Sequence, residues 1–198
     1  EVLVGDFDGN GRDDLVMVRA PKLNGQYAAM NALIALSTGS GLGSATNRTL
    51  THPNTQTSFA SLKVHAGDVD GDGDDDLVVV HRGSPVNGND LARAHTYLST
   101  GGGAFAGAAS STLSASSTSD SYSGDALVDV NGDGLADLVG DRAYSVTGAI
   151  CSDCDSDVSI VTNLGHGNGL FGGQISSTGW SGAGAGIGYF TATFVDYN

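Results

Sequence analysis

The feature that most constrains the fold of this chain is an Asp-rich segment that occurs three times and ends each time in Asp-Leu-Val. The three copies align without gaps and begin at Asp6, Asp68 and Asp129, at intervals of 62 and 61 residues. A fourth copy begins at Asp196 and includes Asn198. Self-similarity at a fixed period indicates a repeat architecture, in which neighbouring units share a continuous core.

A glycine-containing motif repeats in step with the Asp-rich segment. Its copies read Leu36-Ser-Thr-Gly39, Leu98-Ser-Thr-Gly101 and Asn163-Leu-Gly165, and we align the glycines Gly39, Gly101 and Gly165 with one another. The third glycine lies three residues further along its unit than the others, which predicts a loop insertion at the CSDC sequence. We therefore expect one repeat array over 1–198, with units over 1–61, 62–125 and 126–190 and the start of a further repeat over 191–198.

Short apolar runs before and after each Asp-rich segment predict strands. Residues 77–80 are all apolar, which is typical of a strand buried on both faces. No window has a sustained apolar period of 3.6 residues, so we expect an all-β fold with almost no helix. Four strands in a unit of about 60 residues match a β-propeller blade. We expect about three four-stranded antiparallel blades, which form part of a larger or assembled propeller because three blades cannot close a ring.

The Asp-rich segment has the composition of a calcium-binding loop. Ca²⁺ takes six to eight oxygen ligands, and oxygen-bearing side chains stand at positions 1, 3, 5 and 9 of each copy. These residues are Asp6, Asp8, Asn10 and Asp14; Asp68, Asp70, Asp72 and Asp76; and Asp129, Asn131, Asp133 and Asp137. Carboxylates crowded in one loop repel one another, and a divalent cation reverses that repulsion. We expect about three Ca²⁺, one per loop, and an incomplete fourth site at Asp196 and Asn198.

The other positions of the loop have separate predicted roles. Glycines at positions 4 and 6 supply the positive φ angles that a tight curl requires. Position 7 differs in every copy, which indicates that its backbone carbonyl is the ligand. Position 8 is expected to face solvent, and the Leu at position 10 to anchor the core. Position 7 is held by Arg12, Asp74 and Leu135, and position 8 by Asp13, Asp75 and Ala136.

Two other loop classes with similar Asp spacing are excluded by the residues on the C-terminal side of the loop. An EF-hand needs a bidentate Glu at position 12 and flanking helices, whereas this chain has Met17, Val79 and Gly140 at position 12. A dockerin-type loop also leads into a helix, which the apolar run at 77–80 disfavours. A solvated acidic turn is the remaining alternative for a single copy, but three aligned copies favour a metal site.

Together these motifs resemble the FG-GAP/VCBS repeat family, the blade unit of integrin-α-like β-propellers. The family pattern is a strand, then DxDGDGxxDL, then a second strand, and the resemblance covers three whole units. It implies that each loop joins two neighbouring strands of a blade and holds one Ca²⁺. It also implies side-chain ligands at positions 1, 3, 5 and 9, and carbonyl ligands from Arg12, Asp74 and Leu135.

Charge and cysteine content restrict the partners. The formal net charge is −14, which argues against a nucleic-acid partner. The sequence has no stretch of 18 apolar residues, so insertion into a membrane is not expected. Cys151 and Cys154 lack the two further soft ligands of a zinc site, so a local disulfide is expected, with free thiols as the alternative.

An open blade edge is a template for strand pairing and offers a route to self-assembly.

No catalytic constellation is visible in the sequence. Residues 167–172 match GxGxxG but lack a following helix, so they are interpreted as a structural turn. The five histidines are scattered and form no spaced metal pair. We therefore expect a non-enzymatic, extracellular or cell-surface module for adhesion or for binding a protein or glycan. The alternatives are a subunit of an extracellular fibre or large adhesin, and an accessory propeller of a secreted enzyme or toxin.

Overall fold

The computed structural model describes residues 1–20, 22–23, 26–27, 30–51, 62–82, 92–113, 121–145 and 156–182. Every regular element in these residues is a strand, and none is a helix that could cross a membrane. The strands are β1 (Val2–Gly5), β2 (Asp14–Arg19), β3 (Lys22–Leu23), β4 (Gln26–Tyr27), β5 (Met30–Ala35), β6 (Thr46–Leu50), β7 (Leu62–Gly67), β8 (Asp76–Arg82), β9 (Ala92–Tyr97), β10 (Ala109–Thr112), β11 (Ser121–Val128), β12 (Asp137–Ser145), β13 (Ser156–Gly165) and β14 (Phe171–Gly182).

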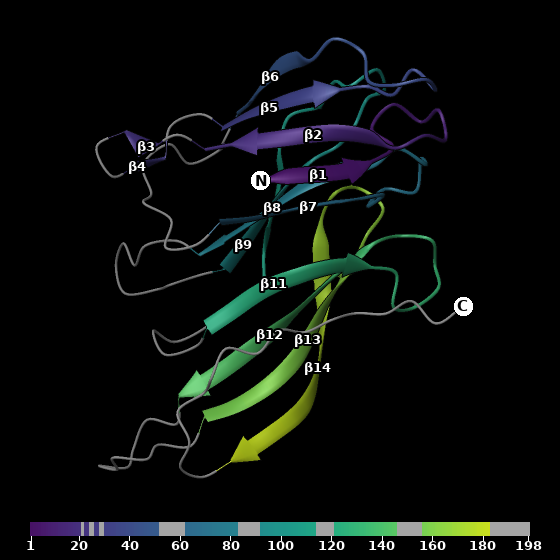
Figure 1. Cartoon of the computed structure of the whole chain (residues 1–198). Helices are drawn as coiled ribbons and strands as arrows, with labels where there is room; N and C mark the ends of the chain where they lie inside the picture. Colours follow the sequence, from purple (N-terminus) through teal and green to yellow (C-terminus); the bar gives the residue numbers. More distant parts are fainter. Residues whose placement is uncertain are drawn as a thin grey trace.

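The strands form three four-stranded antiparallel sheets, which we name blades 1, 2 and 3. Their orders are β1-β2-β5-β6, β7-β8-β9-β10 and β11-β12-β13-β14, so neighbours in the sheet follow one another along the chain. Only the small β3-β4 sheet interrupts this order, inside blade 1. Figure 1 shows the three blades stacked in sequence order. The predicted all-β fold of propeller-type blades is confirmed.

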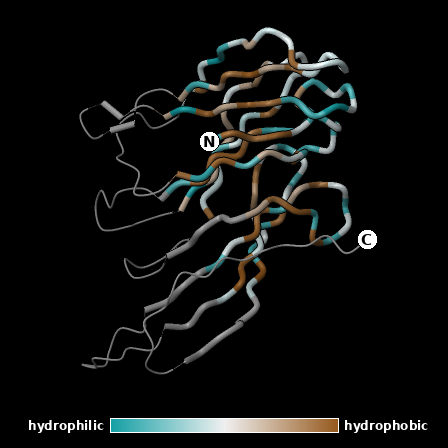
Figure 2. The backbone as a smooth tube through the Cα atoms, viewed as in Figure 1, coloured by the Kyte–Doolittle hydropathy of each residue, from teal (hydrophilic) through white to brown (hydrophobic). Residues whose placement is uncertain are grey.

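Both faces of blade 2 are covered, because side chains of its inner strand β8 pack against blade 1 on one face and against blade 3 on the other. Val79 belongs to the core shared with blade 1, which includes Val16 and Ile34. Val78 points to the opposite face and joins the core shared with blade 3, which includes Leu138. Alternation along one strand therefore builds two separate cores, and we name them the 1–2 junction and the 2–3 junction. Figure 2 shows hydrophobic residues along the strands and hydrophilic ones at the Asp-rich loops.

The three Asp-rich loops, one in each blade, lie along the same edge of the stacked blades. Each one connects the first strand of a blade to the second, at the β1–β2, β7–β8 and β11–β12 turns (Figure 1). The first strands also lie beside one another, since β7 contacts both β1 and β11. Stacking thus brings consecutive loops together along one edge. The predicted fourth site and the CSDC segment lie outside the described residues.

Candidate metal centres

The loops, named loop 1 (6–14), loop 2 (68–76) and loop 3 (129–137), share one backbone conformation. As predicted, the glycines at positions 4 and 6 have positive φ, for example 68° at Gly9 and 78° at Gly11. The same holds for Gly71 and Gly73 in loop 2 and for Gly132 and Gly134 in loop 3. A residue with a Cβ adopts this region at a cost, so glycine is required for the curl.

The Asp at position 1 fixes the curl through backbone hydrogen bonds. Asp6 Oδ1 accepts from the amide of Asn10 at 3.1 Å, and its Oδ2 accepts from Gly11 at 2.6 Å. Asp68 and Asp129 accept equivalent bonds from the glycine at position 6 of their own loops. The carboxylate at position 1 therefore sits at the centre of each loop, with the backbone wrapped round it.

Positions 3 and 5 repeat the same kind of contact on a smaller scale. The side-chain oxygens of Asp70 and Asn131 accept from the amide two residues further on, at 3.3 and 2.8 Å. Asp72 and Asp133 do likewise, each at 2.9 Å. These short-range bonds hold the oxygen-bearing side chains on the inside of the curl, as the alternate spacing predicts. An Asn or an Asp serves equally because only an acceptor oxygen is needed.

The Asp at position 9 joins its loop to the glycine-containing motif. Asp76 is fully buried, and its two carboxylate oxygens accept from the amides of Val69 at 3.0 Å and Ser99 at 2.7 Å. Asp14 makes the same pair of bonds in blade 1, and Asp137 in blade 3. This residue therefore has a structural role in addition to any metal ligation, which the sequence analysis did not separate.

The position-9 bonds correct the alignment of the glycine motif in blade 3. Asp137 accepts from Gly165, where the other blades have Ser37 and Ser99. The counterpart of Gly39 and Gly101 is therefore Gly167, two residues later than predicted, and all three have positive φ. Gly165 is a glycine for another reason, since a Cβ there would lie 2.7 Å from the carbonyl of Ala136.

Carboxylate oxygens converge in the first two loops. One oxygen from each of Asp6, Asp8 and Asp14 lies within 4.8 Å of the others. Asp68, Asp70 and Asp76 form the same arrangement in loop 2. Because Ca²⁺ binds oxygen at 2.3–2.6 Å, two ligands on one ion are at most about 5 Å apart. The spacing and the all-oxygen donor set thus fit a hard cation.

Charge and burial perturb the carboxyl groups of loop 2. Burial raises the pKa of Asp76 to about 7, although hydrogen bonds from Ser99 and Val69 oppose the shift. Burial and then the neighbouring Asp72 raise the pKa of Asp70. In loop 3, by contrast, the backbone hydrogen bond from Gly134 lowers the pKa of the exposed Asp129. The backbone thus stabilises the ionised form of Asp129, while burial opposes the ionisation of Asp70 and Asp76.

The prediction that position 8 faces solvent is wrong for blades 2 and 3. The Asp75 amide donates to the carbonyl of Asp6 at 2.6 Å, and its carboxylate accepts from the Asp6 amide at 2.9 Å. The Ala136 amide donates to the carbonyl of Asp68 at 2.9 Å. Loops 2 and 3 are therefore each bonded to the loop before them. Asp13, which has no preceding loop in the described residues, is exposed as predicted.

Position 7 also contacts the preceding loop through its side chain. A Cβ added to Gly9 would collide with the Asp74 carboxylate, and one added to Gly71 would lie 3.1 Å from the Leu135 side chain. The carboxylate of Asp74 therefore lies among the acidic groups of loop 1. Burial, and then repulsion from Asp72 and from Asp6, raise its pKa. Whether the position-7 carbonyls bind metal stays a prediction.

The core leucines at position 10 match the prediction in part. Leu77 and Leu138 are fully buried in the two junctions. Leu15 is only half-buried, because it points to the face of blade 1 that neither of the other two described blades covers.

Two histidines form a contact that the sequence analysis missed. His81 and His95 are buried on neighbouring strands, with stacked rings whose Nε2 atoms are 2.6 Å apart. His95 Nδ1 also bonds to Ser110 Oγ at 2.7 Å. The two histidines meet diagonally across the β8–β9 ladder, so only the strand register reveals the pair.

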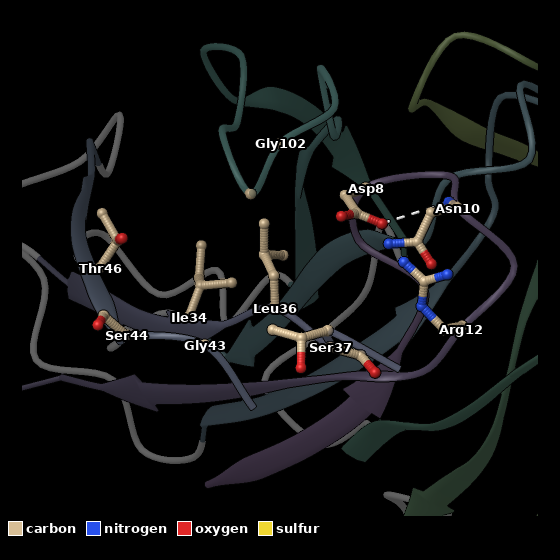
Figure 3. Close-up of a pocket in the computed structure, with 12 residues that line it drawn as sticks. Asp8, Asn10, Arg12, Ile34, Leu36, Ser37, Gly43, Ser44, Thr46 and Gly102 are labelled. Atoms are coloured by element: carbon tan, nitrogen blue, oxygen red, sulfur yellow. Dashed lines mark hydrogen bonds between the residues drawn. The ribbon is translucent and has the colours of Figure 1, made fainter. Parts of the chain in front are cut away.

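A pocket of about 320 Å³ lies beside loop 1 (Figure 3). One end is formed by Asp8, Asn10 and Arg12, and the floor by the apolar side chains of Ile34 and Leu36. The far wall comes from the glycine turn of blade 2, 102–103. The pocket thus places apolar side chains next to the predicted oxygen ligands of loop 1.

The fold and the repeated loops define a β-propeller-like repeat module. Comparison with protein families identifies it further: residues 6–79 match the FG-GAP-like repeat, over more than one full period of the array. Over that stretch the resemblance inferred from the motifs is confirmed. No curated protein matches the chain.

Proposed function

We propose that this chain is a non-enzymatic, calcium-binding module of the extracellular space or cell surface, in which Ca²⁺ rigidifies each blade. The observation that carries the proposal is the convergence of three carboxylates within 4.8 Å in each of loops 1 and 2. Loop 3 has the same curl and an equivalent donor set.

Calcium explains why so much acid is gathered at one edge. Two like charges at about 4 Å repel by about 4 kcal/mol near a protein surface. Stacking adds to this repulsion, because Asp74 and Asp75 of loop 2 both lie against loop 1. One divalent ion per loop would neutralise part of the charge and favour the stacked arrangement.

The role of the ions is structural rather than catalytic in this proposal. The ligands at positions 1 and 9 are tied to the backbone by hydrogen bonds, so the ion would hold the loop against the glycine motif of its own blade. The partner class is a protein or a glycan, and the pocket beside loop 1 is where we place it. There the half-buried side chain of Leu36 would face the nonpolar part of the ligand.

Calcium titration by calorimetry, together with thermal unfolding in calcium and in excess chelator, tests the proposal. We expect about three ions per chain and a higher melting temperature with calcium, because the ion binds the folded state. Asp8→Ala should remove one ion. Asp13→Ala, which removes a carboxylate from the same loop at a position that is not a predicted ligand, should keep all three.

The proposal fails if titration gives no binding heat and chelator leaves the melting temperature unchanged. Equal ion counts in both variants would instead remove loop 1 from the set of sites. A subunit role in an extracellular fibre is the second candidate, and the exposed apolar side chains of Met17 and Ile175 support it.

A further inference from the structure

The contact between His81 and His95 has no part in the proposed function, and its geometry limits how many protons the two rings can hold. The ring planes are 11° apart, and the Nε2 atoms lie much closer together, at 2.6 Å, than the ring centroids, at 4.7 Å. The rings therefore meet edge to edge at Nε2, where one nitrogen donates a proton and the other accepts it. Both residues are buried, at 2% and 1% exposed.

The histidine pair lies on the side of blade 2 that packs on blade 1. Directly paired residues of an antiparallel ladder share a face, and so do alternate residues of one strand. His95 pairs with Val79, which belongs to the 1–2 junction, and His81 follows Val79 by two residues on β8. Tyr97, two residues after His95, belongs to the same core. The two rings are therefore part of the 1–2 junction, at the end of β8 away from loop 2.

The contact allows the pair one positive charge at most. A neutral imidazole has an N–H at one nitrogen only, whereas an imidazolium has an N–H at both. Two imidazolium rings would point two N–H groups at each other across 2.6 Å, with no acceptor between them and with like charges repelling. Burial further opposes a charge on either ring. At least one of the two histidines must therefore stay neutral while the contact exists.

The hydrogen bond to Ser110 fixes one ring of the pair. His95 Nδ1 and Ser110 Oγ are 2.7 Å apart. A hydroxyl can donate or accept, so this bond holds the His95 ring in place for either position of the shared proton. The ring therefore stays at the contact whichever nitrogen carries the proton.

The neighbouring charged and titratable groups do not favour a positive charge on the pair. In the part of the chain that the structure describes, those on the surfaces facing it are Arg93 and Tyr97 on β9, Glu1 ahead of β1 and Arg48 on β6. Arg93 is the ladder partner of His81 and adds a positive charge on the same face. Burial raises the pKa of Tyr97, which therefore stays neutral in acid. Glu1 is the only acid among these groups, and Lys63 and His65 lie on the opposite face of blade 2.

We propose that the His81–His95 pair is a pH-sensitive switch that holds the 1–2 junction closed at neutral pH and opens it in acid. Once blade 1 moves away, water reaches both rings, and each can take up a proton near the ordinary histidine pKa of about 6.5. Below that pH the open state binds at least one proton more than the closed state, so the closed state loses stability as the pH falls. Each pH unit below about 6.5 should shift the equilibrium about tenfold toward the open state.

Opening would change the pocket beside loop 1, because its walls come from two blades. Leu36 follows β5 of blade 1, and Gly102 lies in the glycine turn of blade 2. Moving blade 1 away separates these walls, so a ligand bound there would be released in acid, a consequence that rests on the proposed function. The switch itself requires neither calcium nor a ligand, so its failure would leave the proposed function intact.

Hydrogen exchange of the whole chain in excess calcium, at a series of pH values on both sides of about 6.5, tests the proposal. The readout is the exchange of β2 and β5, which pack at the 1–2 junction, divided by that of β12 and β13 in the same sample. This ratio cancels the intrinsic pH dependence of exchange. We expect it to rise about tenfold per pH unit below about pH 6.5.

A double variant and a matched control assign the rise to the pair. Replacing both rings, with His81→Gln and His95→Gln together, should abolish the pH dependence, because two glutamine amides can bond to each other but do not titrate in this range. His166→Gln removes an exposed histidine of blade 3 and should leave the rise unchanged. A rise that persists in the double variant would overturn the proposal, since acid would then act through other groups.

Nitrogen NMR of the histidine side chains gives a second test on the wild-type chain, which needs no variant to fold. At neutral pH we expect one proton on the two Nε2 atoms together. A second proton should appear there only as the exchange of β2 and β5 increases. Two protonated Nε2 atoms in a chain whose 1–2 junction stays protected would contradict the switch, and so would an exchange ratio that does not change with pH in the wild type.

Discussion

The 1–2 junction and the 2–3 junction have the same backbone geometry but different chemistry. In both, the amide at position 8 of the following loop donates to the carbonyl at position 1 of the preceding one. The side chains at positions 7 and 8 are Asp74 and Asp75 at the 1–2 junction, and Leu135 and Ala136 at the 2–3 junction. The backbone bond therefore sets how blades stack, while the side chains set how much charge the junction carries.

The difference indicates that the 1–2 junction depends more on charge neutralisation. Burial raises the pKa of Asp75, with further repulsion from Asp6 and Asp68. The 2–3 junction replaces both acids with apolar groups, one of which lies 3.1 Å from the Cβ position of Gly71. Apolar side chains at one junction and acidic side chains at the other are compatible with the same stacking, in which the backbone bond is kept.

The largest expected effect comes from placing a charge in either core. Val79→Asp at the 1–2 junction and Val78→Asp at the 2–3 junction should each lower the free energy of unfolding by about 3–5 kcal/mol, because both positions are fully buried. Hydrogen exchange should then show which strands lose protection. Val79→Asp should expose β1 and β2 first, and Val78→Asp should expose β12 and β13 first. Identical exchange patterns would mean that the two cores are not separate.

Calcium removal should distinguish the junctions next. If each site is at a hundred times its dissociation constant, bound ion stabilises the fold by about 2.7 kcal/mol per site. Chelation should therefore lower the melting temperature markedly. Amide exchange should increase more at the contact of β1 with β7 than at that of β7 with β11, because more carboxylates meet at the 1–2 junction. Equal increases at both contacts would contradict a special dependence on charge.

The local parts of the site could be predicted from the sequence, and the contacts between blades could not. The curl of each loop follows from residues within nine positions of one another, so the Asp spacing and the glycines at positions 4 and 6 were sufficient. The bond from the Asp6 amide to the Asp75 carboxylate joins residues 69 positions apart, and it exists only because the blades stack. His81 and His95 likewise meet through the strand register. The insertion in blade 3 obscured the alignment of Gly165, since a glycine also occurs two residues later.

A smaller effect is expected from adding one methyl group beneath position 8. In Gly5→Ala the new Cβ would collide with the Asp75 carboxylate and displace its hydrogen bond to Asp6. We expect a loss of about 1–2 kcal/mol, the cost of one partly buried hydrogen bond. The matched change at the other junction is Gly67→Ala, whose Cβ would lie 3.3 Å from the Leu127 side chain. It should cost less than Gly5→Ala, because the nearest atom is the end of the flexible Leu127 side chain, which can move aside. Urea unfolding of both variants measures the difference, and equal losses would show that the Asp75 bond contributes nothing.

The smallest effect is expected from Asp75→Asn, and its sign is informative. The amide oxygen can still accept the hydrogen bond from Asp6, so only the negative charge is removed. Without calcium this variant should be more stable than the wild type by about 0.5 kcal/mol, because repulsion with Asp6 and Asp68 is relieved. The gain should disappear at high salt, which screens such interactions. Asp13→Asn removes the same charge at an exposed position outside the junction and should give a smaller gain. Destabilisation by Asp75→Asn at low salt would mean that the Asp75 carboxylate binds a cation or a hydrogen-bond donor more strongly than it repels the neighbouring acids. The negative charge of Asp75 would then stabilise the 1–2 junction rather than destabilise it.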